Sequence, residues 1–259
     1  MKTIAFMNLK GGVAKTTTTV NAAAILARDC KQSVLVVDAD SQCNTTEFFS
    51  PPGVQSGHGT HCTFADLLRR TDVGPVIRPS SFPHVDLLPA DDTLMDLDLS
   101  KVEGKAVDIN CLRRLLKMPR YNFYDWVLID CPPSFNAAAA AALLAADQVV
   151  IPIKLDAFSL RGMANLQRQI HNMTQINRGL AIAGFLPTMA YKSKTLEEAA
   201  AALKKSGLPV FSPIRRSAPV DNMTFSQEPL IVSSPKSAAC QDYRRFVKEL
   251  MEGGADRGV

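Results

Sequence analysis

The chain has little of what marks a secreted, disulfide-bonded or membrane-spanning protein. Its six cysteines are scattered and none of them forms a C-x-x-C pair, which favours free thiols over a disulfide framework or a zinc site. No apolar run approaches the roughly 20 residues needed to cross a bilayer. No signal peptide precedes the first apolar stretch. These absences predict a cytoplasmic protein without membrane contact.

The chain also lacks internal repeats and any linker that would divide it. We therefore expect a single domain over residues 1–259, a length that can bury the core of one large α/β domain. Residues 50–63 are rich in Gly, Pro and Ser and predict an irregular loop, and residues 253–259 predict a short polar tail. The loop carries an H-x-x-H-C run at 58–62, but no other histidine-rich segment supplies further metal ligands. A mobile polar loop is therefore favoured over a metal site.

Charge is present in ordinary amounts and is nearly balanced. Charged residues make up 21% of the chain and hydrophobic residues 46%, as is usual for a globular protein. The formal net charge of +4 is a mild excess of basic residues. Such an excess permits contact with nucleic acid without requiring it.

Apolar runs of strand length alternate with segments of helical spacing. Continuous runs of this kind are typical of strands buried on both faces of a parallel sheet. The runs are Ile4–Met7, Val34–Val37, Val85–Leu88, Trp126–Ile129, Val149–Ile153 and Ile182–Leu186. Helices are predicted at residues 18–27, 137–146, 160–176 and 243–251. The alternation predicts an α/β fold with a doubly wound, mostly parallel central sheet flanked by helices.

A glycine-containing turn follows the first predicted strand and precedes the first predicted helix. Strand, glycine turn, lysine, hydroxyl and helix is the layout that holds a nucleotide polyphosphate, because backbone N–H groups point at the phosphates. Lys15 would supply a point charge, and Thr16 would supply a hydroxyl for Mg²⁺. The candidate nucleotide-binding residues of this loop are Lys10, Gly11, Gly12, Val13, Ala14, Lys15, Thr16 and Thr17.

Aspartates directly follow two of the predicted strands. Asp38 and Asp40 come after the second strand, and Asp130 comes after the strand at Trp126–Ile129. The carboxyl ends of parallel strands meet at one edge of a sheet, so these carboxylates are expected beside the phosphate loop, where they can hold Mg²⁺. Either one alone could equally be a helix N-cap or turn residue. Together they favour a nucleotide site.

The loop and both acidic segments resemble motifs of the ParA/MinD family of deviant Walker A ATPases, and most closely those of ParA/Soj-type partitioning proteins. Residues 10–16 resemble K-G-G-x-G-K-[ST], residues 38–44 resemble the D-x-D-P-Q-G-N switch, and residues 130–134 read D-C-P-P-S. The likeness runs through most of the chain, as far as P-K-S at 235–237. It implies a P-loop NTPase fold, ATP and Mg²⁺ as cofactors, and ATP hydrolysis as the activity.

The resemblance also implies roles for individual residues. Lys10 would reach across an ATP-dependent homodimer to the nucleotide bound by the partner subunit. Lys15 would hold the phosphates of the nucleotide bound by its own subunit, and Asp40 would orient the attacking water. The implied Mg²⁺ site is Thr16, Asp40 and Asp130. The segment that resembles I-P-R-N implies adenine-lining residues, which are Met189, Pro213, Ile214, Arg215 and Arg216. The candidate contacts to DNA, whose alternative is a solvated charged surface, are Lys192, Lys194, Arg215, Arg216 and Lys236.

Four positions depart from the family pattern. Ala14 stands where the family has glycine before the catalytic lysine, and its methyl group is tolerated at negative φ but costly at positive φ. Ser41 and Cys43 replace the proline and glycine of the switch. Pro219 replaces an arginine, which weakens the expectation of DNA binding.

The resemblance implies a partitioning ATPase with weak intrinsic activity. Such a protein would dimerise on ATP, bind DNA nonspecifically on the nucleoid, and be switched off when a ParB-like centromere-binding protein stimulates hydrolysis. The DNA moved would belong to a plasmid, a chromosome or a mobile element. The alternative is a MinD-like or scaffold-associated positioning ATPase without DNA binding. A redox enzyme of the same superfamily would need a cysteine pair around a shared cluster, for which Cys111 and Cys131 are the candidates.

Overall fold

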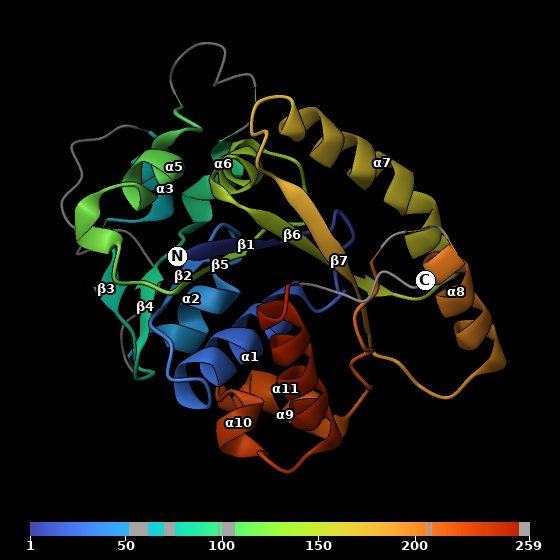
Figure 1. Cartoon of the computed structure of the whole chain (residues 1–259). Helices are drawn as coiled ribbons and strands as arrows, with labels where there is room; N and C mark the ends of the chain where they lie inside the picture. Colours follow the sequence, from blue (N-terminus) through green and yellow to red (C-terminus); the bar gives the residue numbers. More distant parts are fainter. Residues whose placement is uncertain are drawn as a thin grey trace.

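A seven-stranded sheet forms the centre of the molecule (Figure 1). Its strand order is β3-β4-β2-β5-β1-β6-β7. The strands are β1 (Lys2–Phe6), β2 (Val34–Asp38), β3 (Arg78–Pro79), β4 (Val85–Leu88), β5 (Trp126–Asp130), β6 (Gln148–Lys154) and β7 (Ala181–Thr188). All six strands predicted from apolar runs are confirmed, most of them one or two residues longer than the runs.

The computed structural model describes residues 1–51, 62–69, 76–97, 99, 107–205, 207 and 209–253. Most of the loop predicted at 50–63, including His58 and His61, lies outside the described residues. So does the tail predicted at 253–259, apart from its first residue.

The sheet is parallel except at one edge. Neighbouring strands from β4 to β7 pair in parallel, and only β3 pairs antiparallel, with β4. The sequence did not predict β3, because two residues, Arg78 and Pro79, are too short to show a period. The doubly wound, mostly parallel sheet predicted from the sequence is confirmed.

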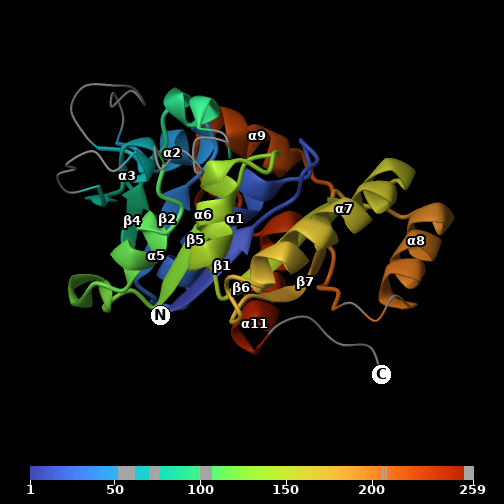
Figure 2. The ribbon, with the colours of Figure 1, turned by 90° about the horizontal axis from the view of Figure 1, so that it is seen from above.

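Helices cover both faces of the sheet (Figure 1). The helices on one face are α1 (Lys15–Arg28), α2 (Asn44–Phe49), α9 (Ala218–Ser226), α10 (Leu230–Ser233) and α11 (Ala238–Met251). Those on the other face are α3 (Phe64–Leu68), α5 (Cys111–Leu116), α6 (Ala137–Ala145) and α7 (Ala157–Thr174), while α8 (Lys194–Lys205) lies beyond the β7 edge (Figure 2). Two short 3₁₀ turns are η1 (Asp92–Asp96) and η2 (Pro119–Tyr121). Within the described ranges, none of the helices is both long and apolar enough to pass through a membrane.

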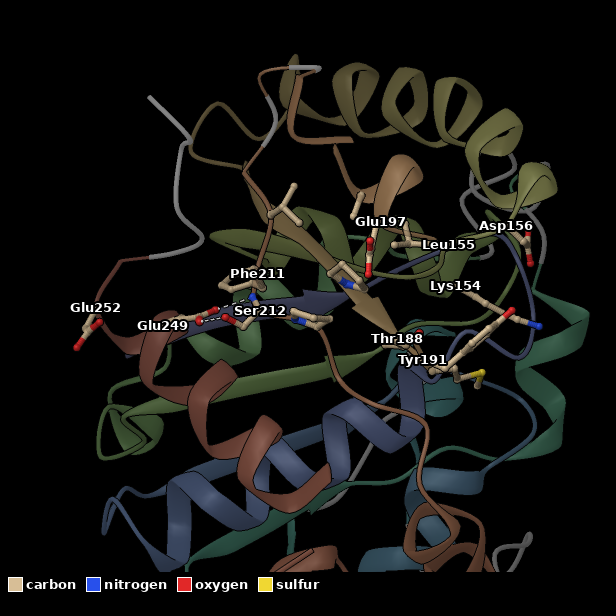
Figure 3. Close-up of a pocket in the computed structure, with 16 residues that line it drawn as sticks. Lys154, Leu155, Asp156, Thr188, Tyr191, Glu197, Phe211, Ser212, Glu249 and Glu252 are labelled. Atoms are coloured by element: carbon tan, nitrogen blue, oxygen red, sulfur yellow. Dashed lines mark hydrogen bonds between the residues drawn. The ribbon is translucent and has the colours of Figure 1, made fainter. Parts of the chain in front are cut away.

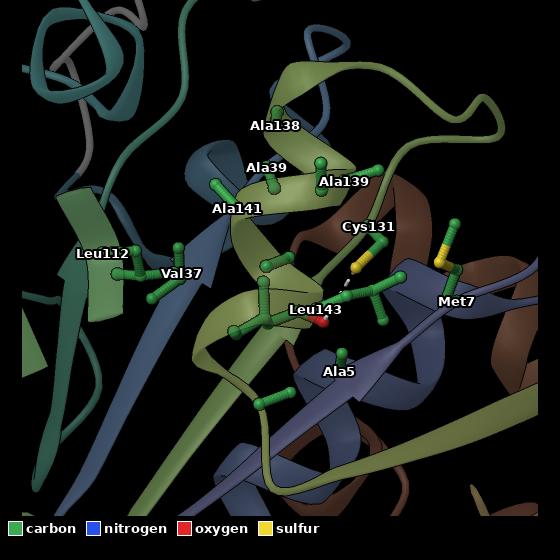
Figure 4. Packing of buried hydrophobic residues seen from close by; sticks show 14 of the residues in the cluster. Ala5, Met7, Val37, Ala39, Leu112, Cys131, Ala138, Ala139, Ala141 and Leu143 are labelled. Carbon is green, nitrogen blue, oxygen red and sulfur yellow. Dashed lines mark hydrogen bonds between the residues drawn. The ribbon is translucent and has the colours of Figure 1, made fainter. Parts of the chain in front are cut away.

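The alanine-rich helix α6 lies directly on the sheet (Figure 4). Alanine is the strongest helix former, and its small side chain allows the helix backbone to approach the strands closely. The side chain of Asn136 caps the helix by accepting the backbone N–H of Ala139 at 3.0 Å. At the other end, buried Asn177 donates to the carbonyls of Leu143 and Ala146 at 3.0 and 2.8 Å. Both ends of this helix, which is buried from Ala137 to Leu144, therefore have hydrogen-bond partners.

The topology places the loop after β1 where ligands bind in such sheets. β1 lies between β5 and β6 in the sheet, and the chain runs from β1 out to β2 before it returns to both neighbours. This reversal of strand order is the switch point of a doubly wound sheet, where a crevice opens at the carboxyl ends of the strands. The ends of β1, β2 and β5, with Asp38 and Asp130, meet at this edge because these residues pair in register.

Candidate phosphate-binding and catalytic site

The loop between β1 and α1 is held by hydrogen bonds to β6 and to the end of β7. The hydroxyl of Thr188, at the end of β7, donates to the carbonyl of Val13 at 3.1 Å. Asn8 donates its side-chain amide to Pro152 in β6 at 2.8 Å and accepts the backbone N–H of Lys10 at 3.0 Å. The loop is thus fixed by contacts to two neighbouring strands.

Lys15 begins α1 and points back into the loop. Its Nζ donates to the carbonyl of Lys10 at 3.3 Å, and only 7% of the residue is exposed. Burial lowers the pKa of Lys15, an effect opposed by the charges of Asp130 and Asp40. A lysine held there beside acidic side chains and helix N–H groups is suited to hold a phosphate.

Asp130 is the centre of a cluster of hydroxyl donors. Thr16 and Thr45 both donate their hydroxyls to its Oδ2, at 2.6 and 2.7 Å, and 1% of the residue is exposed. Its Oδ1 is buried and has no hydrogen-bond partner among the described residues. Burial raises the pKa of Asp130, and the neighbouring Asp40 raises it further.

This oxygen-rich arrangement fits a divalent cation. A buried carboxylate oxygen without a donor, next to the hydroxyl of Thr16, matches the hard oxygen ligands that Mg²⁺ prefers. No group of three or more His, Cys, Asp or Glu in the described part of the chain could hold a metal ion by itself. A cation here would therefore share its coordination with the phosphates and water.

Asp38 holds the switch segment in place. Its Oδ2 accepts the backbone N–H and the hydroxyl of Thr46, both at 2.8 Å, and its Oδ1 accepts the backbone N–H of Asp40 at 3.1 Å. The residue is fully buried and lies opposite Asp130 in the sheet register. Burial raises the pKa of Asp38, and the charge of Asp130 raises it further. With both oxygens occupied, Asp38 organises the site more than it offers a free ligand.

Asp40 is more open than the other two aspartates. The residue is half-buried, and its Oδ1 accepts the backbone N–H of Gln42 at 3.1 Å. Burial raises the pKa of Asp40, while the charge of Lys15 lowers it. Its carboxylate thus lies close enough to Lys15 to interact electrostatically, which brings the predicted catalytic and phosphate-binding residues together.

Lys10 is paired within its own chain. Its Nζ forms an ion pair with Asp156, with distances of 2.9 and 2.8 Å to the two carboxylate oxygens. The side chains are 37% and 29% exposed. Asp156 was not among the residues predicted from the sequence, although it follows the end of β6 just as Asp130 ends β5, and the same signal could have found it.

Two residues at family glycine positions have left-handed backbones. Ala14, the N-cap of α1, has φ 66° and ψ 35°, and Cys43, the N-cap of α2, has φ 56° and ψ 17°. Such backbones favour glycine because a Cβ crowds the following carbonyl. An alanine at position 14 would be tolerated at negative φ and costly at positive φ, and the structure shows the positive value. Both the phosphate loop and the switch therefore carry local strain.

A cavity of about 490 Å³ leads away from the phosphate loop. Ala14 and Thr17 line the end nearest the loop. Predicted adenine-lining residues that line the same cavity are Met189, Ile214, Arg215 and Arg216. The structure does not place Pro213 with them, since it lines a neighbouring cavity of about 780 Å³. Figure 3 shows this second cavity, with Thr188, Tyr191, Phe211 and Ser212 among the side chains around it.

The candidate DNA-binding residues are not equivalent. Lys192 is exposed between β7 and α8, and Lys194 is exposed at the first position of α8. Arg216 is exposed in the segment that pairs with the end of β7, and Lys236 is exposed just before α11. Arg215 differs, because its guanidinium is bound to Asp242.

Thr45 and Thr46 are further site residues, and neither was predicted from the sequence. They directly follow the residues 38–44 that resemble the family switch, and the motif ends one residue before them. Their hydroxyls bind Asp130 and Asp38, respectively. Hydroxyl residues that open a helix after an acidic loop are the available signal.

Comparison with known proteins shows similarity over nearly the whole chain. A family model described as an AAA domain matches residues 1–182. The sporulation initiation inhibitor protein Soj of Bacillus subtilis is 31% identical, with 98% of this chain and 99% of Soj covered. The chromosome partitioning protein ParA of Myxococcus xanthus is also 31% identical, with 96% of this chain and 87% of that protein covered.

A solved structure agrees with the fold at comparable coverage. Cobyrinic acid a,c-diamide synthase from Mycobacterium smegmatis, with bound ATP analogue and magnesium, has a TM-score of 0.81 and 28% identity. The match covers 97% of this chain and 94% of the synthase. That protein holds its nucleotide and magnesium on the same overall architecture.

The first prediction concerns the strain at Ala14. A left-handed backbone costs an alanine roughly 1–2 kcal/mol, whereas the greater freedom of glycine in the unfolded chain offsets about 0.4–1 kcal/mol of the gain. We expect Ala14→Gly to raise the free energy of unfolding by about 0.5–1 kcal/mol, measured by urea denaturation without nucleotide. The control Ala145→Gly, in the last turn of α6, should lower it by about 1 kcal/mol. A loss of stability in both variants would contradict the account.

The second prediction concerns the raised pKa values of Asp38 and Asp130. Folding raises the pKa values of both carboxyls. At pH values between their pKa in the unfolded chain and their higher pKa in the folded protein, the folded protein therefore binds more protons than the unfolded chain. The free energy of unfolding should therefore fall as pH rises through this range. Asp38→Asn should make that dependence shallower, so that the variant gains on the wild type between pH 5.5 and pH 8. Urea denaturation with EDTA and without nucleotide tests this, and parallel profiles would contradict it.

Proposed function

Since the chain belongs to the ParA/MinD family of deviant Walker A ATPases, we propose that it binds and hydrolyses Mg²⁺-ATP as the switch of a DNA-partitioning cycle. The observation that carries this is the cluster around Asp130, where two hydroxyls and a nearby lysine meet at the end of the phosphate loop. A nucleoside triphosphate supplies the negative charge that Lys15 and the helix N-terminus favour.

The proposed ATP site uses residues from three strand ends. The backbone of residues 10–17 and Lys15 hold the phosphates, and the 490 Å³ cavity takes the nucleoside. Thr16, Asp40 and Asp130 hold Mg²⁺ directly or through water. When bound, the ion offsets phosphate charge and orients the terminal phosphate.

Hydrolysis is an in-line attack of water on the terminal phosphate. Asp40 is the most exposed of the three aspartates, and it orients the water. Its raised pKa moves this carboxylate toward the range in which it can accept a proton. Lys15 and Lys10 stabilise the charge on the transferring group.

Dimerisation requires Lys10 to change partners. In the single chain its Nζ is bound to Asp156. In the proposed dimer it leaves Asp156 and binds the phosphates of the second subunit. A partly exposed ion pair is weak, on the order of 0–1 kcal/mol, so this exchange presents only a small barrier to assembly.

The ATP-bound dimer is proposed to bind DNA nonspecifically through exposed basic side chains. The candidates left after Arg215 is assigned to Asp242 are Lys192, Lys194, Arg216 and Lys236. A ParB-like centromere-binding protein would stimulate hydrolysis and release the dimer from the nucleoid. The name of the related chromosome partitioning protein ParA of Myxococcus xanthus supports a role in partitioning.

The alternative functions make different demands on the chain. A positioning ATPase on a scaffold would keep the nucleotide cycle and lack DNA binding. A redox enzyme would need cysteines at a subunit surface, but Cys111 and Cys131 are 3% and 0% exposed in the core. The structure therefore gives no support to the redox reading.

The third prediction tests hydrolysis. Asp40→Ala should bind ATP with nearly wild-type affinity, because the phosphate loop is unchanged, and lose about 100-fold in phosphate release. Calorimetry and a phosphate-release assay measure the two effects. The control Gln42→Ala keeps the backbone N–H that binds Asp40 and should keep turnover. Equal turnover by Asp40→Ala and wild type would remove Asp40 from the mechanism.

The fourth prediction tests DNA binding. The wild type should bind random-sequence duplex DNA with ATP and not with ADP, and binding should weaken steeply as salt rises. Lys10→Ala should bind nucleotide but neither dimerise nor bind DNA, whereas the exposed control Lys117→Ala should behave like the wild type. Light scattering and fluorescence anisotropy measure these properties. ATP-dependent dimers without DNA binding would favour the scaffold-associated alternative.

A further inference from the structure

Arg215 is bound to α11 by four hydrogen bonds, three of them to Asp242. Its Nε donates to Asp242 Oδ2 and its Nη2 to Asp242 Oδ1, both at 2.8 Å. Its backbone N–H also donates to Asp242 Oδ2, at 3.0 Å, and Nη2 donates to the carbonyl of Ala238 at 3.3 Å. In this bidentate geometry two N–H groups of the guanidinium fork bind the two carboxylate oxygens, so the orientation of the pair is fixed in addition to its electrostatic attraction.

The pair is buried on one side only. Asp242 is 2% exposed, while the side chain of Arg215 is 54% exposed. The only other cation near the carboxylate in the described ranges is Arg245, at 3.9 Å. A buried carboxylate has a strong preference for a fixed donor. Asp242 therefore holds Arg215 more firmly than an ion pair between two exposed side chains would.

The segment carrying Arg215 is fixed on its other side by the sheet. Ile214 donates its backbone N–H to the carbonyl of Pro187 at 2.8 Å and accepts that of Ala190 at 2.9 Å. Arg216 donates its backbone N–H to the carbonyl of Ala190 at 2.9 Å. Residues 214–216 thus lie between the end of β7 and α11, and all three line the 490 Å³ cavity.

We propose that Arg215 is a positioning residue for the nucleobase, and that it acts through Ile214 and Arg216 by tying their segment to Asp242. The inference rests on the proposed ATP function, because the cavity is the nucleoside site only if ATP occupies the phosphate loop. It also removes Arg215 from the candidate DNA contacts.

The test distinguishes binding of the base and sugar from binding of the phosphates. Calorimetry would compare the dissociation constants of Mg²⁺-ATP and of Mg²⁺-tripolyphosphate, which lacks base and sugar. Arg215→Met keeps most of the apolar stem and loses the fork. It should weaken ATP binding about tenfold, since small displacements of a binding wall are costly, and change tripolyphosphate binding less than about twofold. Arg215→Lys keeps the charge without the fork and should fall between Arg215→Met and the wild type.

Two further variants guard against a general loss of structure. Arg245→Met removes the second cation near Asp242 without touching the cavity wall, and it should leave both constants unchanged. Asp242→Asn keeps the shape of the acceptor and should reproduce the selective loss of ATP affinity. Thermal unfolding of every variant shows whether the fold is retained at the assay temperature.

The outcomes are distinct. A selective loss of ATP affinity in Arg215→Met and Asp242→Asn supports the proposal. Equal losses for ATP and tripolyphosphate, or unchanged ATP affinity, overturn it while the proposed function stands. Failure of the wild type to bind ATP at all would overturn the proposed function and the inference together.

Discussion

The burial of Asp130 beside Lys15 at the carboxyl ends of the central strands is the constraint on which the site depends. A buried carboxylate is tolerated only when donors surround it, and here Thr16 and Thr45 bind one oxygen while the other remains without a partner in the described structure. Thr16 belongs to α1 and Thr45 to α2, so this one carboxylate joins the phosphate loop to the switch. A cation and phosphates bound at the site would therefore affect the phosphate loop and the switch together, through their shared contacts to Asp130.

The sequence predicted the fold well where burial produces a readable pattern. The six long strands and helices α1, α6, α7 and α11 follow from continuous apolar runs and from helical spacing. The two-residue β3 and the short helices α3 and α10 do not, because so few residues cannot display a period. Their positions are set by tertiary contacts, such as the pairing of Arg78 with Leu87.

The candidate site was predictable in its motifs and not in its partners. Predicted strand ends and a glycine turn identify the positions of residues 10–17, Asp38, Asp40 and Asp130 in the sequence. Asp242 is an ordinary acid in sequence and becomes informative only when Arg215 is seen bound to it. Asp156 follows a strand end, as Asp130 does, but its pairing with Lys10 is visible only in the structure. The left-handed backbone of Ala14 could be posed as a question from the sequence, but only coordinates give its sign. How these residues act on ATP stays a prediction.

The most direct test of the account is calorimetric titration of the wild type with ATP, with and without Mg²⁺, beside Lys15→Ala. We expect one ATP bound per chain, tighter binding when Mg²⁺ is present, and no detectable binding by Lys15→Ala. Absence of binding to the wild type, or equal binding by the folded variant, would contradict the claim that this loop and the carboxylate behind it form a nucleotide site.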